Sequence, residues 1–215
     1  MKIYTIHSPS HQYFYNMFQE SFNKLNSKHT LVSRVVEQIS EPDFNSKDVY
    51  KFYRLMVLYI LEILYTETEP FIFMGVDIYF FKDFDIDMGD NDMLVTYEKH
   101  VFGLPTICTG VTFLKPNKAN RKMFLWILKY FDIFKADQTG VNAYLFLNKF
   151  KTYPFRLKWK LLPLEFYSIN YNNGNMVWNG EDIKVTVDPY LFHYHWTLGN
   201  ANRLKLLKMV RKQFE

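Results

Sequence analysis

The chain has 215 residues, of which 48% are hydrophobic and 19% aromatic, which is enough apolar material for one packed domain. Its 8 glycines and 8 prolines exclude a fibrous or low-complexity protein. The net charge of +4 permits an anionic ligand but does not indicate a nucleic-acid-binding protein. The single cysteine, Cys108, excludes a disulfide framework and favours a reducing compartment.

Membrane insertion and secretion are both disfavoured. The N-terminal residues 1–6 have the pattern of a strand and not that of a signal peptide. The most apolar helical segment, residues 55–64, is far shorter than the roughly 20 apolar residues that cross a membrane, and it contains Glu62. We therefore expect a soluble protein without a transmembrane segment, and a monomer.

A first strand is predicted over residues 2–6, followed at once by His7 and Ser8. Imidazole and hydroxyl groups directly after an N-terminal strand suit a loop that approaches a ligand. The alternative is a plain Ser-Pro turn that leads into a helix over residues 12–25. Residues 30–36 predict a further strand or the start of a helix.

The next helix is predicted over residues 47–64, after a loop in which Ser46 can cap it. Its second half is apolar nearly all round, so it must be buried against the sheet. Arg54 is its one mid-helix arginine. The pattern favours an arginine that reaches the surface, and the alternative is a cation that contacts a diphosphate.

The stretch from Pro70 to Phe81 predicts a central parallel strand buried on both faces, because Phe, Ile, Val and Tyr run through it between polar turn signals. It carries one carboxylate, Asp77, near its far end, where open α/β sheets bind their ligands. An unpaired buried carboxylate is costly, so Asp77 needs a metal, an arginine or backbone donors as its partner. The alternative is that Asp77 only caps a turn.

Residues 82–92 contain alternating aspartates, but the glycine and glutamate of an EF-hand loop are missing from their places, so a solvated acidic loop is predicted. A short strand over residues 93–97 precedes another over residues 106–114. The Thr109-Gly110 pair inside the second strand permits close approach of another backbone or of a ligand.

The last third of the chain predicts helices separated by short strands. One helix starts at Pro116-Asn117, and another is opened by Asp137-Gln138, where Asp137 can simply be the N-cap. Residues 161–167 predict an edge strand, because their proline cannot donate to a ladder, and residues 171–175 predict a turn. The chain ends in a basic amphipathic helix over residues 203–214.

Five motifs follow one another in this chain: a helix with an arginine, an apolar strand with an aspartate, a Thr-Gly strand, an Asp-Gln helix start and a late His-x-x-Trp. This order resembles the metal-dependent glycosyltransferases of the GT-A fold, in particular the nucleotide-diphospho-sugar transferase group, from Met1 to about Arg203. With its opening Lys2-Ile3-Tyr4-Thr5 segment the chain also resembles the small glycosyltransferases of chlorella viruses. The resemblance implies one α/β domain over residues 1–215, Rossmann-like, with a mostly parallel central sheet flanked by helices. The basic helix over residues 203–215 could join a further domain.

The segment from Phe73 to Ile78 occupies the place of the family's Asp-x-Asp motif, with Gly75 where the first aspartate belongs. The resemblance implies that Asp77 and His193 are metal ligands and that His195 replaces the family's asparagine. Oxygen ligands with one imidazole suit Mn²⁺ or Mg²⁺. Because Gly75 leaves one role vacant, the alternative is a catalytically weak or inactive nucleotide- or sugar-binding module, and Gly75→Asp is expected to raise metal affinity.

The resemblance also assigns roles to residues in the other motifs. Asp137 and Gln138 are implied as catalytic residues that face the transferred sugar and the acceptor. Thr109 and Gly110 are implied to lie beside the sugar, and Arg54 near the phosphates. The donor-binding residues expected in this way are Thr5, His7, Ser8, Arg54, Val76, Asp77, Thr109 and Gly110.

The activity that the resemblance implies is transfer of a hexose or deoxyhexose from a nucleotide-diphospho-sugar, with a UDP-sugar expected, to a glycan or glycoprotein acceptor. A divalent cation would stabilise the departing diphosphate. We expect a cytoplasmic protein, in the host cytoplasm if it is viral. A nucleic-acid-binding protein is disfavoured, because the basic residues outside the C-terminal helix are scattered.

Overall fold

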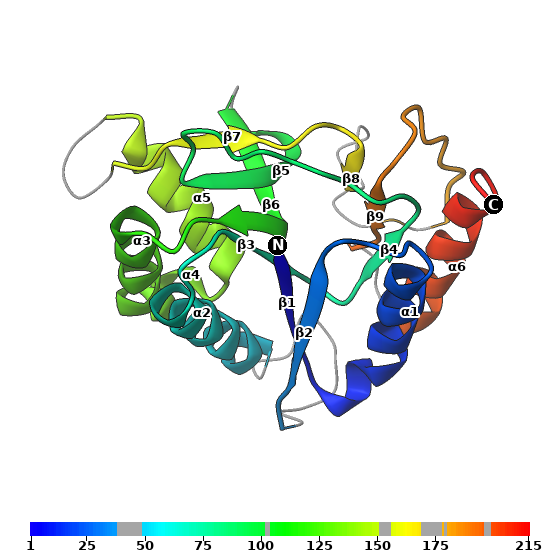
Figure 1. Ribbon diagram of the computed structural model, residues 1–215, viewed down its shortest axis with the longest axis horizontal. Coiled ribbons are helices and arrows are strands. Elements are labelled where there is room, and N and C mark those ends of the chain that lie inside the picture. The colour runs from blue at the N-terminus through cyan, green and yellow to red at the C-terminus, as the bar shows by residue number, and fades with distance from the viewer. Residues whose placement is uncertain (38–48, 102–103, 151–155, 169–177, 179, 196–198) are drawn as a thin grey trace.

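The computed structural model describes residues 1–37, 49–101, 104–150, 156–168, 178, 180–195 and 199–215. Two sheets lie among helices (Figure 1). The larger sheet has the order β2-β1-β3-β6-β5-β7 and contains β1 (Lys2–His7), β2 (Thr30–Val35), β3 (Phe71–Met74), β5 (Met93–Val101), β6 (Leu104–Leu114) and β7 (Trp159–Leu161). The smaller sheet has the order β4-β9-β8 and contains β4 (Ile78–Phe80), β8 (Phe166–Ser168) and β9 (Leu191–His193).

The helices are the short 3-10 turn η1 (Pro9–His11), α1 (Gln12–Asn23), α2 (Val49–Thr66), α3 (Lys118–Lys129), α4 (Phe131–Phe134), α5 (Asp137–Asn148) and α6 (Asn200–Arg211). In the described ranges, none of these helices combines the length and the apolar character needed to cross a membrane. In the larger sheet β1 runs parallel to β2 and β3, and β7 runs parallel to β5. Strand β6 is antiparallel to both of its neighbours. The expected α/β fold with a mostly parallel sheet flanked by helices is confirmed.

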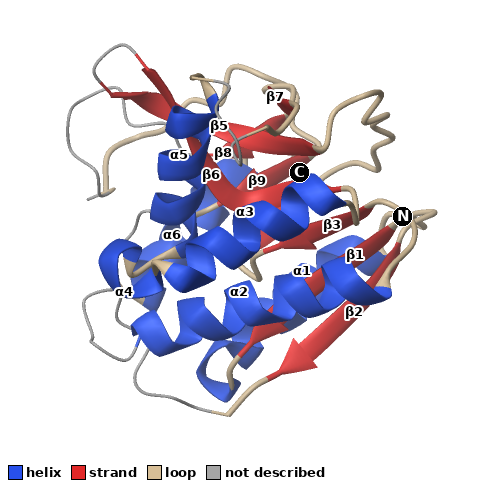
Figure 2. Ribbon diagram, turned by 90° about the vertical axis from the view of Figure 1, so that its left-hand side faces the viewer, coloured by secondary structure: helices blue, strands red, loops and turns tan. Residues whose placement is uncertain are grey.

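The larger sheet is apolar on both faces because its side chains alternate between two cores. Tyr4, Ile6 and Phe73 point into one core, whereas Ile3 and Ile72 point into the other. Helices α2, α3 and α5 cover the first face, and Figure 2 shows α2 and α3 lying across the strands. A strand that is covered on both faces reads as a continuous apolar run, as predicted for β3.

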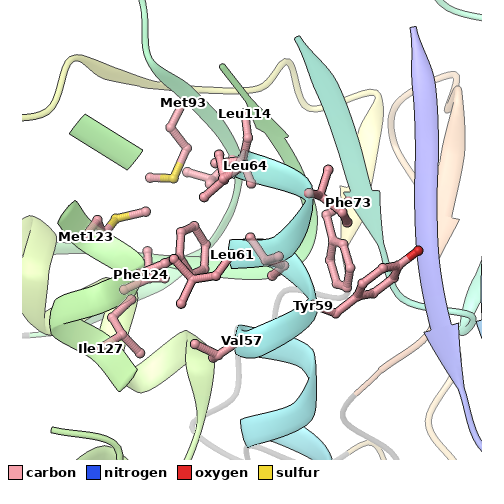
Figure 3. Packing of buried hydrophobic residues seen from close by; sticks show 14 of the residues in the cluster. Val57, Tyr59, Leu61, Leu64, Phe73, Met93, Leu114, Met123, Phe124 and Ile127 are labelled. Carbon is pink, nitrogen blue, oxygen red and sulfur yellow. The ribbon is translucent and has the colours of Figure 1, made fainter. Parts of the chain in front are cut away.

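Helix α2 supplies the centre of the first core. Figure 3 shows Leu61 and Leu64 of α2 between Phe124 of α3 and Phe73 of β3. The ring of Tyr59 meets that of Phe73 edge-on, with 6.2 Å between the ring centres. The burial of these side chains confirms that the second half of α2 packs against the sheet.

The smaller sheet lies between the larger sheet and the helices α1 and α6 (Figure 1). Phe18 of α1 packs on Phe80 of β4, with 5.1 Å between the ring centres. Leu207 of α6 shares a core with Phe192 and Tyr194 at the end of β9. This arrangement brings the C-terminal helix back against the first helix of the chain.

The prediction of one strand over Pro70–Phe81 is wrong. Strand β3 ends at Met74 and β4 begins at Ile78, and the two strands belong to different sheets. The amide of Gly75 still donates to the carbonyl of Gly110 in the larger sheet, at 3.0 Å. The carbonyl of Asp77 already accepts the amide of Tyr194, also at 3.0 Å. The chain therefore crosses from the larger sheet to the smaller one at residues 75–77. It does so because β3 before them pairs with β6, whereas β4 after them pairs with β9.

The edge strand predicted over residues 161–167 is divided in the same way. Strand β7 ends at Leu161, and β8 begins at Phe166 in the smaller sheet. Between them the amide of Phe166 donates to the carbonyl of Pro163 at 3.1 Å and closes a turn. The proline therefore marks the change of sheet instead of lying within an edge strand.

Other local predictions have mixed outcomes. Residues 30–35 form a strand, the loop over residues 82–92 contains no strand or helix, and Asn117 caps α3 by accepting two backbone amides. Asp137 is not the N-cap of α5, since Ala136 holds that position and Asp137 is the first helical residue. Ser46, Trp196 and the turn predicted over residues 171–175 lie outside the described residues.

Candidate functional site

Asp77 and His193 are neighbours in space although 116 residues separate them in the chain. Oδ1 of Asp77 lies 3.2 Å from Nε2 of His193. The two meet because β4 follows Asp77 directly and pairs antiparallel with β9, which places Ile78 opposite His193. The side chain of Asp77 is 18% exposed and that of His193 only 5%, so the pair is mostly buried and Asp77 is its more accessible member.

The backbone at Gly110 makes room for the ring of His193. A Cβ atom built at Gly110 would lie 1.9 Å from Cε1 of that ring, which no side chain permits. The pairing of β5 with β6 jumps here, since Val95 lies opposite Thr112 while Thr96 lies opposite Cys108. The Thr-Gly pair predicts close approach of another backbone or of a ligand, and the group that approaches Gly110 in the structure is instead a side chain, the imidazole of His193.

Gly75 also has a steric reason to be glycine. A Cβ atom at this position would lie 2.6 Å from Oδ1 of Asp77 and 3.9 Å from Nε2 of His193. The carboxylate of Asp77 therefore occupies the space that the Cβ atom of an aspartate at position 75 would need. The expectation that Gly75→Asp raises metal affinity conflicts with this geometry.

Cys108 lies on the far side of His193, a position that its sequence context did not reveal. Its Sγ atom is 3.4 Å from Nδ1 of His193 and 3.7 Å from Nε2 of His195. The two imidazole rings are stacked, with 4.1 Å between their centres. Cys108, His193 and His195 are all buried and form a group that could hold a metal ion.

The charges in this group shift one another's pKa values. Burial favours the neutral form of Asp77, but the neighbouring His193 and Arg203 outweigh it and hold the pKa of Asp77 well below its usual range. Burial likewise opposes the charged form of His193, yet the Asp77 carboxylate raises the pKa of His193 to about 10. Burial and the charge of His193 hold the pKa of His195 well below its ordinary value. The pair is thus charged in the metal-free protein, and His195 is neutral.

Arg203 is a buried cation that the sequence interpretation overlooked. It lies in the first turn of α6, is 3% exposed, and its guanidinium carbon is 5.7 Å from the ring centre of Phe14. Its charge lowers the pKa of Asp77 and adds to the effect of burial in lowering the pKa of His11. A signal was present: Arg203 shares one helical stripe with the buried residues Leu206, Leu207 and Val210 of α6.

Arg54, the arginine that the resemblance assigned to the phosphates, lies elsewhere. Its side chain is 52% exposed, and its Nη1 atom is 3.8 Å from Oδ1 of Asp132. This position agrees with the first interpretation of a surface arginine. Contact between Arg54 and a diphosphate stays a prediction.

Asp137 and Thr109 form the second polar group of the site. The buried carboxylate of Asp137 accepts hydrogen bonds from Thr109 and from the backbone amides of residues 137 and 138. Burial nevertheless raises the pKa of Asp137 above its ordinary value. Burial also raises the pKa of Tyr53 on α2, and the carboxylates of Asp137 and Asp77 raise it further. The carboxylates of both groups thus act on the hydroxyl of Tyr53.

Gln138 points to a carboxylate of the protein itself. Its Nε2 atom donates to both carboxylate oxygens of Glu98, at 3.0 Å each. Glu98 is buried on β5, and sequence reasoning missed it. The period of two along the strand would have placed it inside, because it follows the buried Thr96 by two positions.

The residues expected under the nucleoside lie at the end of β1. All of them are buried, namely Thr5, His7 and Ser8. Val76 is also buried and follows β3, the strand that pairs with β1. Within the described ranges, Oγ1 of Thr5 and Nδ1 of His7 have no hydrogen-bond partner. Oγ of Ser8 lies 3.1 Å from Nδ1 of His11, whose pKa responds to the charges of Arg203 and Asp77. The end of β1 therefore lies near the Asp77 group.

Comparison with known proteins bears on the family and the fold of the chain. The family model described as nucleotide-diphospho-sugar transferase matches residues 16–207, which is most of the chain. A search of curated proteins finds no match.

Several solved glycosyltransferase structures resemble the chain. One is a glycosyltransferase involved in the glycosylation of the major capsid of PBCV-1, at 16% identity and a TM-score of 0.61, covering 97% of this chain and 98% of that one. Another is GlyE of Streptococcus pneumoniae TIGR4, at 12% identity and a TM-score of 0.56, covering 100% and 64%. The galactosyltransferase LgtC is similar at 10% identity and a TM-score of 0.52, covering 99% and 96%. At these identities the likeness concerns the fold.

Proposed function

Because the chain belongs to the nucleotide-diphospho-sugar transferase family and is a glycosyltransferase, we propose that it transfers a hexose or deoxyhexose from a UDP-sugar to a glycan or glycoprotein acceptor. The observation that carries this proposal is the contact between Asp77 and His193 at the carboxyl end of β3. Ligands of open α/β sheets bind at such an edge. The remaining polar residues of the site surround this contact.

The Asp77–His193 contact fits a divalent cation. Adjacent ligands of an octahedral ion with bonds of about 2.1 Å lie about 3 Å apart, and the two ligand atoms here are 3.2 Å apart. One carboxylate oxygen and one imidazole nitrogen suit Mn²⁺ or Mg²⁺, with the diphosphate and water completing the shell. When bound, such an ion neutralises the charge that builds on the departing diphosphate.

Arg203 is the protein cation best placed to bind the same diphosphate. Its guanidinium is buried, and its charge acts on both Asp77 and His11. A planar guanidinium can donate two parallel hydrogen bonds to phosphate oxygens, and burial strengthens these bonds. We assign to Arg203 the phosphate contact that the resemblance gave to Arg54.

Asp137 acts on the sugar side of the bond that breaks. Thr109 and the amino end of α5 hold its carboxylate in place. In this position it stabilises positive charge on the sugar ring or accepts the proton of the acceptor hydroxyl. Gln138 holds Glu98 and so fixes the first turn of α5 against β5, which makes it a positioning residue in this proposal.

The nucleoside is assigned to the end of β1, where Thr5, His7 and Ser8 lie. The unpartnered Nδ1 of His7 and the Ser8–His11 pair, both within the described residues, supply polar groups there. Gly75 leaves only backbone beside Asp77, Gly110 leaves only backbone beside His193, and Val76 links Gly75 to Asp77, which permits a tight fit around the diphosphate and the sugar.

Donor hydrolysis and nucleotide binding together test the proposal. We expect calorimetry to show UDP binding that requires Mn²⁺ or Mg²⁺, and a panel of UDP-sugars to include one that releases free sugar and UDP. Binding of UDP without turnover of any donor would favour the alternative, a catalytically weak or inactive binding module in which Gly75 stands in the place of the first motif aspartate. Failure to bind any nucleoside diphosphate with either ion would overturn the proposal.

A further inference from the structure

Cys108, His193 and His195 bring a thiol and two imidazoles to one buried point beside β6 and β9. Sγ of Cys108 lies 3.4 Å from Nδ1 of His193 and 3.7 Å from Nε2 of His195, and the ligand atoms of the three residues lie within 4.8 Å of one another. In a tetrahedral zinc site with Zn–S of about 2.3 Å and Zn–N of about 2.0 Å, sulfur and nitrogen are about 3.5 Å apart. The two sulfur–nitrogen distances are therefore close to those of a bound site, and the stacked rings of His193 and His195 have to turn on binding so that both lone pairs meet at one ion.

In each histidine, the ring nitrogen that points away from Cys108 faces an oxygen acceptor, as in histidines that bind a metal. Nε2 of His193 faces the carboxylate of Asp77 at 3.2 Å, and Nδ1 of His195 faces the carbonyl oxygen of His193 at 3.2 Å. A histidine that binds a metal through one nitrogen usually donates the other N–H to a carboxylate or a carbonyl, which fixes its tautomer. When the imidazolium of His193 gives up its Nδ1 proton on binding a metal ion, both donations leave Nδ1 of His193 and Nε2 of His195 as lone-pair donors beside the sulfur.

The surroundings of Cys108 also suit a thiolate ligand. The amide of Gly110 donates to its Sγ atom at 3.4 Å, and the side chain is buried beneath the two imidazole rings. Thiolate and imidazole together select Zn²⁺ and chemically similar ions over Mn²⁺ and Mg²⁺, which prefer oxygen.

We propose that Cys108, His193 and His195 bind a thiolate-preferring divalent ion of the Zn²⁺ type, with a fourth position left for water or another small ligand. This ligand set is distinct from the Asp77–His193 pair, because it uses Nδ1 of His193 and keeps Asp77 as a hydrogen-bond acceptor. The pair of the proposed transferase site uses Nε2, which requires the opposite tautomer of His193. The two modes therefore exclude each other, and in so far as the proposed function holds, Zn²⁺ inhibits transfer.

Cobalt provides a spectroscopic test that does not depend on any nucleotide-sugar. The full chain is freed of metal with a chelator, the chelator is removed, and Co²⁺ is titrated in. We expect one equivalent of Co²⁺ to produce a thiolate-to-cobalt charge-transfer band and the visible bands of tetrahedral cobalt, and Zn²⁺ to abolish both. Because Cys108 is the only cysteine of the chain, any thiolate band must come from it.

Three variants separate ligands from supporting groups. Cys108→Ser removes the charge-transfer band, and His195→Asn removes the tetrahedral spectrum. Asp77→Asn keeps the charge-transfer band but weakens Zn²⁺ binding by about 10- to 100-fold, as expected when the partner of a metal-binding histidine is lost. Circular dichroism establishes that each variant is folded, and the wild-type spectrum is decisive even where a variant is not. Co²⁺ binding without a thiolate band, or no saturable binding of Co²⁺ and Zn²⁺, would overturn the site and leave the transferase proposal untouched.

Discussion

The carboxylate of Asp77 and the imidazole of His193 meet at 3.2 Å, where the chain passes from the larger sheet to the smaller one. The contact depends on two glycines, since a Cβ atom at Gly75 would crowd Asp77 and one at Gly110 would overlap His193. The buried side of the same imidazole faces Cys108. His193 is thus the residue on which both metal-binding modes depend.

Removal of the Asp77 carboxylate should abolish activity and also weaken the fold. Asp77→Ala eliminates the oxygen ligand and leaves His193 buried without its charged partner, which costs about 1–3 kcal/mol in the free energy of unfolding. Metal-dependent donor hydrolysis and urea unfolding measure the two effects. Asp90→Ala, in an exposed turn of the acidic loop, is the matched control and should change neither. Full metal-dependent activity in Asp77→Ala would show that the carboxylate is not a ligand.

The two histidines should differ in their effect on Mn²⁺ dependence. His193→Ala removes the nitrogen next to Asp77, whereas His195→Ala removes a group that faces Cys108. We expect the Mn²⁺ concentration for half-maximal donor hydrolysis to rise much more in His193→Ala. The reverse order would mean that the transferase metal is held by the Cys108 side of the cluster.

Adding a single methyl group at either glycine should damage the site, and Gly110 should be the more sensitive position. Gly110→Ala forces the packed ring of His193 to move, whereas Gly75→Ala meets the end of the Asp77 side chain. Overpacking of this kind costs about 1–3 kcal/mol, and the larger cost is expected at Gly110. Thermal unfolding and Mn²⁺ affinity measure the effect. A gain of metal affinity in Gly75→Ala or Gly75→Asp would show that Asp77 can move aside without loss.

The two arginines provide a direct contrast between position in the sequence and position in space. Arg203→Gln should lower kcat by about 10²–10³-fold, the usual cost of removing one donor that stabilises transition-state charge. Arg54→Gln, beside the exposed Asp132, should leave kcat close to the wild-type value. Circular dichroism checks the fold of the Arg203 variant, and Arg203→Lys should restore part of the activity. Equal losses in the two glutamine variants would return Arg54 to the phosphate site.

The hydrogen bond between Thr109 and Asp137 should be visible in the pH dependence of activity. This bond lowers the pKa of Asp137, against the raising effect of burial. In Thr109→Val the pKa should therefore rise, and the acidic limb of the kcat/KM profile should move to higher pH. Asp137→Asn should remove that limb together with most of the activity. An unshifted profile in Thr109→Val would mean that another group controls the acidic limb.

The local elements were largely predictable because they depend on neighbours only two to four residues away. The continuous apolar run around Phe73 and the helical spacing in α2 and α3 follow from the geometry of buried strands and of helices. The same reasoning identified the Thr109-Gly110 break, since a glycine within a strand indicates close approach. The chemistry of Asp77 followed from the cost of burying a carboxylate.

What the sequence by itself determined was therefore most of the helices and the apolar strand segments, and the carboxylate that had to find a partner. Only the tertiary structure decided that Pro70–Phe81 divides between two sheets and that Arg203, not Arg54, is buried near Asp77. Strand order and register depend on pairing between distant segments, as between β4 and β9, and the local pattern is the same whichever partner is chosen. The same long-range pairing brings Cys108, His193 and His195 together, and no spacing along the chain could have shown it.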